Sequence, residues 1–548
     1  MSAADWTRPA AELDRRWLGG EAGHRSLLGS GRVNRERRMV LYGAGGIGLV
    51  LTMYLGATGL VLTVVLLVVA AAATARSRTG SRLDRVRSWR RWRQQCSSGT
   101  DVFIPVIRRP AGVLEAVSAG KPDAEQRRTF NAYRDNPDGA EGMTWLHARP
   151  GAPGIVWHYP TGEDAWLSVV FELDGAVAGL QSNDTLNART RAFGRLQAQF
   201  GPGTALARRL QIITRLHPVD TAVYEAWAAN EIDPDAPREL LESYAEVLSR
   251  LGTGGLRQRH YAVVRWPLTP DFLAAGRSYG PNQQGWLWLM REQIDLVWRQ
   301  LADAGLGPSS ALSAARVAAV LRHLQHPSWP VDQAGDVNPF DMWMPSRMQR
   351  TYVAVTDNDP EGRERTWLHR TAVVPIDSID TASRDALWML PMLVRMQEHV
   401  VRTISVQLEG VPQEVARKRA SEDLSSDLAD DISRQQAGKL DDGRLGVAAE
   451  ASNARLRDLE PGRGTEGLGW AMHITVSAES VDALRASCAH MESAARRSGI
   501  DSLQWLDTQH AAAQACTWPL ARGMRPNGAG GFLRGLLGGD NKGQEQPL

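Results

Sequence analysis

The chain has 548 residues, of which 43% are apolar and 23% charged, a composition that excludes a largely disordered or fibrous protein. The net charge of +2 hides an asymmetry, because residues 1–93 carry 16 basic and 6 acidic side chains and the rest carries 47 and 55. The acidic body would repel phosphate, so no direct nucleic-acid binding is predicted, whereas the basic part suits an anionic membrane face.

The strongest signal in chain order is an uncharged run near the amino terminus. Residues 39–75 contain no charged side chain, although one helix needs only about 20 residues to cross the hydrocarbon core. A turn at residues 56–59, Gly-Ala-Thr-Gly, divides the run into two short predicted spans, 39–55 and 60–75.

Basic residues flank both ends of this run. They are Arg32, Arg35, Arg37 and Arg38 before it, and Arg76, Arg78, Arg82, Arg85, Arg87, Arg90, Arg91 and Arg93 after it. Because positive charge marks the cytoplasmic side, both ends are predicted to be cytoplasmic, which requires a hairpin that crosses twice. Only four of the 63 basic residues are lysines, a bias typical of GC-rich bacterial genomes, so the predicted location is the bacterial inner membrane.

Three alternatives remain open: a cleaved signal peptide, a single tilted span, and a buried core hairpin. A signal peptide has an apolar region of only about 7 to 15 residues, and soluble core helices rarely carry arginine clusters at both edges. Gly43, Gly45, Gly46 and Gly48 in the first span are typical of membrane helices that approach a neighbour closely, and they predict lateral assembly.

Residues 82–93 combine arginines with Leu83, Val86, Trp89 and Trp92. This pattern is typical of an interfacial helix whose indoles lie at headgroup depth. A stop-transfer charge cluster explains the arginines equally well.

The body that follows alternates strands and helices. The predicted elements of its first part are strands at 155–159, 166–173, 209–217 and 260–268, with helices beginning near Ser182 and over 239–251. This order resembles a ferredoxin-like unit. Amphipathic helices follow at 284–304 and 310–325, and then a loop-like stretch at 327–345. The second part has predicted strands at 351–356, 366–375, 401–408 and 470–477, a polar helical hairpin at 411–458, a helix at 480–498 and a short segment at 500–506.

The predicted fold class is therefore membrane-anchored α+β, with an N-terminal two-helix transmembrane hairpin and two ferredoxin-like α/β lobes with intervening helices. The predicted divisions are a cytoplasmic segment 1–38, the hairpin 39–75, a basic juxtamembrane helix 76–100, a first lobe 101–275, a helical linker region 276–345, a second lobe 346–526 and a tail 527–548. The tail is glycine-rich and polar, which predicts flexibility.

Parts of the sequence resemble a known family of membrane machinery. The paired spans and the following RTGSRLDRVRSWRRWR, residues 78–93, resemble the PrgI-type small inner-membrane subunit of type IV secretion systems. The body resembles the amino-terminal, non-motor domain of the conjugative-transfer ATPase, best in GWAMHITVSAESVDALRASCAHMESAARRSGI, residues 469–500, and in the exit segment QHAAAQACTWPLARGMRP, residues 509–526. Actinobacterial fusions of these two parts look most similar, and the resemblance spans residues 30–526.

One motif of that family is missing. Its motor binds nucleotide through G-x-x-x-x-G-K-[ST], whereas the two Gly-Lys pairs here, ending at Lys121 and Lys439, continue with Pro and Leu. The resemblance therefore implies a membrane component without its own ATPase. Its expected partners are a separately encoded P-loop secretion ATPase and other membrane subunits of the apparatus, in an oligomer.

Two polar patterns have the appearance of metal sites. His323 and His326 have a spacing that could place two ligands on one helix face, but no third ligand is evident, and exposed or capping histidines are the favoured interpretation. Asp357, Asp359 and Glu361 resemble the start of a calcium loop but lack its distal glutamate, which favours a solvated turn. No metal and no cofactor are therefore predicted.

Cysteine chemistry is also disfavoured. Cys96, Cys488 and Cys516 are too few and too scattered for a disulfide framework or a Cys-based zinc site. Cys488 and His490 are two positions apart on a predicted helix and would not face each other, so they are not predicted to form a catalytic pair.

The loop-like segment NPFDMWMP offers a candidate for partner docking through Phe340 and Trp343. Packing of this loop on its own domain is the favoured alternative. The leading prediction for the whole chain is a non-catalytic structural component of a conjugation or type IV secretion-like apparatus, which docks or braces a transfer ATPase. A scaffold of a type VII-like secretion system and a membrane-surface enzyme are the alternatives.

Overall fold

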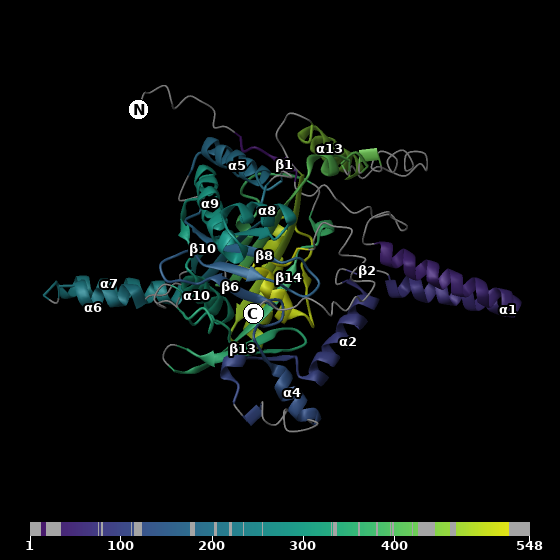
Figure 1. The fold of residues 1–548 in the computed structure, drawn as a ribbon, viewed down its shortest axis with the longest axis horizontal. Helices are drawn as coiled ribbons and strands as arrows, with labels where there is room; N and C mark the ends of the chain where they lie inside the picture. Colours follow the sequence, from purple (N-terminus) through teal and green to yellow (C-terminus); the bar gives the residue numbers. More distant parts are fainter. Residues whose placement is uncertain are drawn as a thin grey trace.

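The computed structural model describes residues 12–17, 34–74, 76–77, 80–110, 112–113, 123–175, 181–201, 205–218, 222–233, 235–254, 256–329, 331, 337–359, 362–379, 382–394, 396, 399–418, 420–422, 424–425, 444–460 and 467–524. They form an α+β body from which helices project on opposite sides (Figure 1). On one side is α1 (Asn34–Thr74), and on the other are α6 (Ala222–Glu231) and α7 (Arg238–Gly254). The predicted tail 527–548 lies outside the described residues.

The uncharged run lies in α1, which is assigned as one helix of 41 residues. Within the described chain, its stretch Val40–Ala71 alone is long and apolar enough to cross a membrane. The backbone leaves helical geometry at Gly56, with φ 54° and ψ −128°. A positive φ is readily adopted by glycine, which has no Cβ, so the break falls on the first residue of the predicted turn.

Strands from the whole length of the body join in one large mixed sheet. Its main path runs β5-β4-β12-β13-β14-β17-β16-β9-β10-β8-β7-β6, with β11 beside β8 and β18 beside β14. The bounds are β4 Val102–Pro105, β5 Tyr133–Arg134, β6 Met143–His147, β7 Ile155–His158, β8 Trp166–Leu173, β9 Arg209–Pro218, β10 Leu256–Pro267, β11 Pro308–Ala311, β12 Ser346–Met348, β13 Val353–Asn358, β14 Glu364–Val373, β16 Val401–Val411, β17 Gly467–Ala478 and β18 Gln504–Trp505. The neighbouring strands run antiparallel except β4 with β5.

The sheet continues across the boundary between the two predicted lobes. β9 and β16 pair directly, with Thr214 opposite Ile404. The structure therefore confirms an α+β body but not two ferredoxin-like lobes. The predicted linker region 276–345 lies against this sheet, because β11 within it pairs with β8.

The remaining elements lie outside this sheet, and four of them form two small sheets, β1 with β15 and β2 with β3. Their bounds are β1 Arg16–Trp17, β2 Arg76–Ser77, β3 Gly80–Ser81, α2 Arg82–Ser98, η2 Val106–Arg108, α4 Ala124–Ala132, α5 Asn183–Ala198, α8 Pro270–Tyr279, α9 Asn282–Asp303, α10 Ala314–Gln325, η3 Ile376–Ser378, β15 Ser383–Arg384, α11 Leu390–Leu393, α13 Arg444–Asp458, α14 Val481–Arg497, α15 His510–Gln514 and η4 Ala515–Thr517. Several helices begin at the caps that their sequence offers, such as Ser182 before α5 and Ser480 before α14.

The two faces of the central strands differ in chemistry. One face carries Leu210, Ile404 and Ile474 and packs against apolar residues of α9 and α14. The opposite face carries buried polar residues, among them Gln211 and Ser405, and is covered by α10 and by the segment from η4 to residue 524. The central strands therefore have one apolar face and one face with buried polar residues.

Candidate functional site

The parts of α1 before and after Gly56 contact each other. The Thr63 hydroxyl donates to the carbonyl oxygen of Gly48 at 2.8 Å, and the Oγ1 atoms of Thr52 and Thr63 are 3.1 Å apart. A Cβ on Gly48 would lie 2.3 Å from Thr63 Cγ2, and one on Gly59 would lie 2.2 Å from the Leu51 carbonyl oxygen. Residues 15 positions apart in a straight helix would be about 22 Å apart, so these contacts depend on the break at Gly56.

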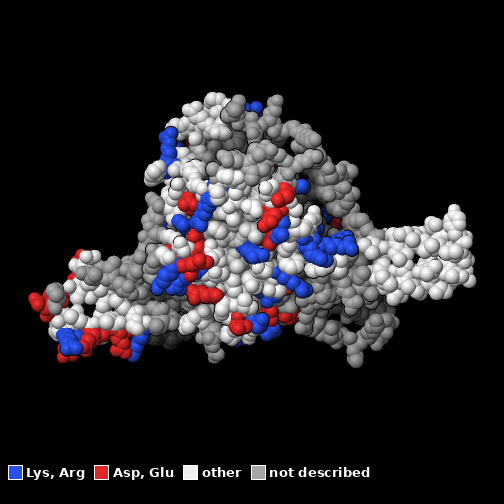
Figure 2. All heavy atoms as spheres, turned by 90° about the horizontal axis from the view of Figure 1, so that it is seen from below, with Lys and Arg blue, Asp and Glu red and all other residues white. Residues whose placement is uncertain are grey.

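The surface of α1 is apolar and largely exposed. Tyr42, Met53 and Tyr54 are 74%, 79% and 86% exposed, and only 11% of its most apolar stretch is buried. Figure 2 shows the corresponding projection, on the right, free of charged side chains. A continuous apolar surface of this size is typical of a segment that contacts lipid or another protein.

Residues on the amino-terminal side of α1 attach to the body. β1 pairs with β15, and the backbone N–H of Asp14 donates to Asn187 Oδ1 of α5 at 2.7 Å. The carboxylate of Asp14 also pairs with Arg191 at 2.8 Å. On the other side of α1, α2 is joined to α4 because Asn131 Nδ2 donates to the Ser98 carbonyl oxygen at 2.9 Å. Both flanks of α1 are therefore fixed to the same body.

Within the predicted juxtamembrane helix 76–100, α2 (Arg82–Ser98) is helical, whereas β2 and β3 before it form a short antiparallel pair. On α2, Arg90, Arg91 and Arg93 are exposed, and the Arg93 guanidinium lies 4.8 Å from the ring centroid of Trp89. Trp89 is 41% exposed, whereas Trp92 is half-buried. The two indoles thus differ in exposure. Of the two, Trp89 is the one that can contact a membrane or another protein.

The other arginines predicted to flank the membrane segment lie at the start of α1, in β2 and at the start of α2. Arg35, Arg37 and Arg38 belong to the first turns of α1, Arg76 to β2, and Arg82 begins α2. Arg78 lies outside the described residues. In Figure 2, Lys and Arg side chains gather near the base of the apolar projection.

The two predicted docking residues separate in the structure. Trp343 is 4% exposed, donates from Nε1 to Asn136 Oδ1 at 3.0 Å, and its ring lies 5.3 Å from that of Trp518. It cannot dock a partner in this state, because the loop packs on its own domain. Phe340 is 67% exposed and remains available at the surface.

A larger exposed apolar surface, which the sequence did not reveal, lies on α6 and α7. Their described side chains are all exposed or half-buried, with Trp227, Leu240 and Val247 at 53%, 63% and 50% exposure. Trp227 packs on Tyr244 with ring centroids 6.0 Å apart. Residues 222–254 also carry seven acidic and two basic side chains, so this surface combines apolar groups with negative charge.

The histidines considered as metal ligands are engaged by carbonyl groups. His323 is 3% exposed, its Nδ1 lies 2.7 Å from the Trp329 carbonyl oxygen, and burial holds its pKa well below 6.5. His326 is fully buried, with Nε2 3.3 Å from the Arg365 carbonyl oxygen. The expected exposure of these histidines was therefore wrong, since α10 faces the polar side of the sheet, whereas His326 is the C-cap residue of α10, as the capping alternative predicted. In the described residues, no group of three or more His, Cys, Asp or Glu could hold a metal ion.

The acidic turn and the buried cysteine have structural partners. Asp357 pairs with Arg108 at 2.8 Å, and Asp359 pairs with Arg365 at 3.0 Å. Glu361 lies outside the described residues. Cys488 is 3% exposed, and burial raises its pKa to about 12, so the thiol stays protonated and unreactive near neutral pH.

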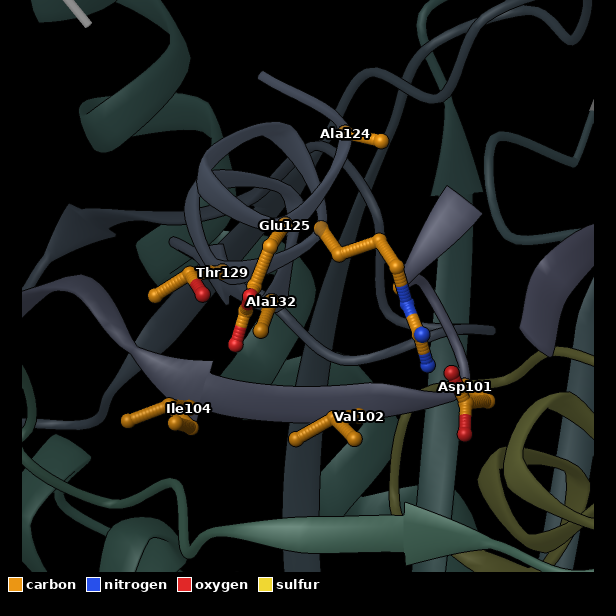
Figure 3. Close-up of a pocket in the computed structure, with 9 residues that line it drawn as sticks. Asp101, Val102, Ile104, Ala124, Glu125, Thr129 and Ala132 are labelled. Carbon is orange, nitrogen blue, oxygen red and sulfur yellow. The ribbon is translucent and has the colours of Figure 1, made fainter. Parts of the chain in front are cut away.

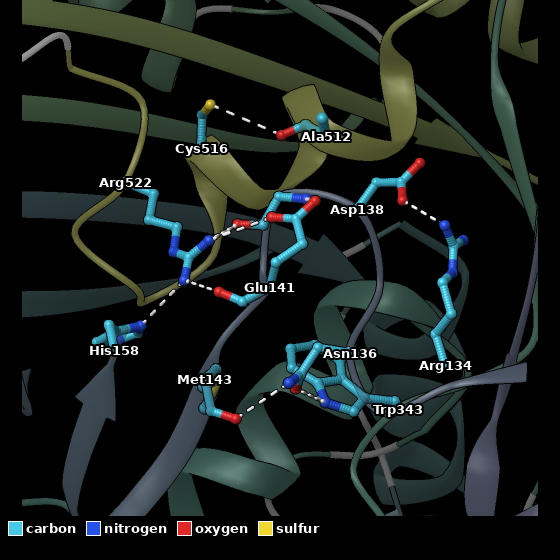
Figure 4. A network of polar contacts seen from close by, with 11 residues as sticks. Arg134, Asn136, Asp138, Glu141, Met143, His158, Trp343, Ala512, Cys516 and Arg522 are labelled. Carbon is cyan, nitrogen blue, oxygen red and sulfur yellow. Dashed lines mark hydrogen bonds and ion pairs between the residues drawn. The ribbon is translucent and has the colours of Figure 1, made fainter. Parts of the chain in front are cut away.

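The exit segment crosses the polar face of the sheet. Gln211 accepts from the backbone N–H of Ala521 at 2.8 Å and donates to the Trp518 carbonyl oxygen at 2.9 Å. The Arg522 guanidinium donates to the carbonyl oxygens of Gly139 and Glu141 at 2.8 and 2.6 Å, and Figure 4 shows it directed toward that loop. The alternating polar residues of β9 could have indicated this arrangement, although they read equally well as a solvated face.

An open cleft of about 560 Å³ lies between α4 and β4 (Figure 3). Short side chains such as Val102, Ala124 and Ala132 form much of its wall, and its charged groups are Asp101, Glu125 and Arg128. Its lining residues include neither a histidine nor a cysteine. No protein-family model matches the chain, and no curated protein matches it.

Proposed function

We propose that this chain is a non-catalytic structural component of a conjugation or type IV secretion-like apparatus in the bacterial inner membrane. In this proposal α1 is a two-helix transmembrane hairpin, both chain ends are cytoplasmic, and the body docks a separately encoded P-loop ATPase. The observation that carries the proposal is the attachment of both flanks of α1 to one body.

This attachment constrains how α1 can cross a membrane. A body held by β1 on one side of α1 and by α2 on the other must lie on a single side of the bilayer. Polar connecting backbone cannot lie in lipid, because its N–H and C=O groups would lack partners. An even number of crossings follows, in agreement with the arginines at both flanks.

The dimensions of α1 support two crossings. Residues 34–55 and 57–74 would each be about 30 Å long at 1.5 Å per residue, which matches the hydrocarbon thickness. The bond from Thr63 to the Gly48 carbonyl oxygen, and the lack of room for a Cβ at Gly48 and Gly59, are typical of close packing between membrane helices. Gly56 provides the reversal.

The docking role is assigned to α6 and α7. They project on the side of the body away from α1, which would be the side away from the membrane (Figure 1). Exposed Trp227 and Leu240 provide apolar contact area, and the acidic surplus favours a partner with a basic surface.

A labelling experiment tests the topology. Thr58→Cys, in a chain lacking Cys96, Cys488 and Cys516, should react with a membrane-impermeant maleimide added outside intact cells. A single tilted span would place position 58 within the bilayer, where it would react only after detergent treatment. That second result would refute the hairpin.

The docking role is tested by recovery of the ATPase. Cross-linked detergent extracts should contain a P-loop transfer ATPase, and Trp227→Ala should lower its recovery several-fold. Phe340→Ala is the matched control, because Phe340 is also exposed but lies elsewhere. Extracts that never contain such an ATPase would contradict the proposed function, whereas equal losses for both variants would contradict only the choice of surface.

A further inference from the structure

A buried cation on the polar face of the sheet lacks a counter-charge. Arg215 of β9 is 1% exposed, and its Nη1 atom donates to Thr403 Oγ1 of β16 at 2.9 Å. Its Nε and Nη2 atoms have no hydrogen-bond partner. Burial lowers the pKa of the guanidinium to about 9, so it still carries its charge at neutral pH.

Three other buried arginines of the sheet have acceptors for their charge. Arg402, also 1% exposed, donates to the carbonyl oxygens of Met392, Val400 and Leu393 at 2.7 to 2.8 Å. Arg209 pairs with Glu409 at 3.1 Å, and Arg259 pairs with Glu172 at 2.8 Å. Each of these three therefore has a carboxylate or carbonyl acceptor, whereas the acceptor of Arg215 is a neutral hydroxyl.

A second guanidinium group neighbours Arg215. Arg259 lies directly opposite it on β10, so two guanidinium groups neighbour each other across the strands. His323 of α10 covers this region, with its ring 4.7 Å from that of His217. Since Nδ1 of His323 donates to a carbonyl oxygen and the buried ring is neutral, its Nε2 is an acceptor, and the donors in this region are the guanidinium groups.

We propose that Arg215 binds a small inorganic anion, a halide or an oxyanion, through its Nε and Nη2 atoms on the face of the sheet that α10 covers. An uncompensated guanidinium is strongly disfavoured in a protein interior, and its two parallel N–H groups fit a single anion well. The bound anion neutralises the Arg215 charge beneath α10 and thereby stabilises the covering of the polar face.

A thermal unfolding series on the full chain in detergent micelles tests this site. At constant ionic strength, chloride or inorganic phosphate replaces gluconate in increasing amounts. The temperature of the unfolding midpoint should rise with the concentration of the added anion and then reach a plateau. The anion that saturates at the lower concentration identifies the ligand as halide or oxyanion. Arg215→Met should weaken this dependence at least about tenfold, because the anion loses its charged fork.

Arg347→Met is the matched control, since the Arg347 side chain is 64% exposed and should leave the dependence intact. An equal response in wild type and Arg215→Met would identify a general salt effect and overturn the proposal. If Arg215→Met does not fold, crystals of the wild type soaked in bromide decide the question. An anomalous peak within hydrogen-bond distance of Arg215 supports the site, and its absence there together with an absent phosphate response refutes it.

Discussion

The contact between the two parts of α1 can be tested by adding a single methyl group. A Cβ at Gly48 would lie 2.3 Å from Thr63 Cγ2 and 2.9 Å from Thr63 Oγ1, whereas one at Gly45 would meet nothing within 4 Å. Carbon atoms in contact prefer about 3.5 to 4.0 Å, so Gly48→Ala must push the two parts of α1 apart. Overpacking of this kind costs about 1 to 3 kcal/mol.

Gly45→Ala is a matched control, because both substitutions replace glycine by alanine in the same helix and gain similar helix propensity. The assay is an SDS titration of the protein in bicelles, followed by energy transfer between dyes on cysteines at the exposed positions 42 and 69. Gly48→Ala should open α1 at lower SDS than Gly45→Ala. Addition of Thr63→Ala should restore much of the difference by removing the two nearest atoms. Equal midpoints for Gly48→Ala and Gly45→Ala would refute the packing argument.

Two further predictions concern buried titratable groups of the body. Burial lowers the pKa of His369 from 6.5 to about 3, so the unfolded chain takes up a proton between these values that the folded chain does not. The contribution of His369 to the free energy of unfolding is therefore fully present above pH 6.5. It decreases as the pH falls, by about 2 kcal/mol at pH 5. Thermal midpoints between pH 7 and 5 should decline less steeply in His369→Gln, while the exposed control His490→Gln should follow wild type. Cys488 should resist thiol reagents at pH 8 in the folded protein and react on unfolding, whereas the less buried Cys96 should be modified first, as measured by site-resolved mass spectrometry.

Local patterns were sufficient to predict most regular elements of the body. The alternation and capping signals placed strands close to β7, β8, β9, β13 and β14, and helices close to α5, α7, α9 and α14. Short strands such as β4, β6 and β12 were missed, because runs of three to five residues carry little periodic signal. β4 and β12 are also held in place by each other, with Ser346 opposite Phe103.

Long-range pairing and the polar face could not be predicted in the same way. Nothing local to Arg215 or Gln211 distinguishes a solvated strand face from one buried beneath a helix and the exit segment. For the same reason, His323 was wrongly expected to be exposed. Trp343 could be interpreted either as a docking residue or as part of its own domain's core. Each of these outcomes depends on partners far away in the sequence, such as Ala521 for Gln211.

The pairing of β1 with β15 has a consequence for how the protein is made. The Arg15 side chain bonds to the carbonyl oxygen of Ser383, across a sequence separation of 368 residues. At about 5 to 20 residues per second, the ribosome needs roughly 20 to 70 s to produce the second partner after the first. During this interval α1 is already outside the ribosome, exposed and apolar. In the proposed topology, α1 would therefore enter the membrane before the body is complete, and the pairing of β1 with β15 would form only after both.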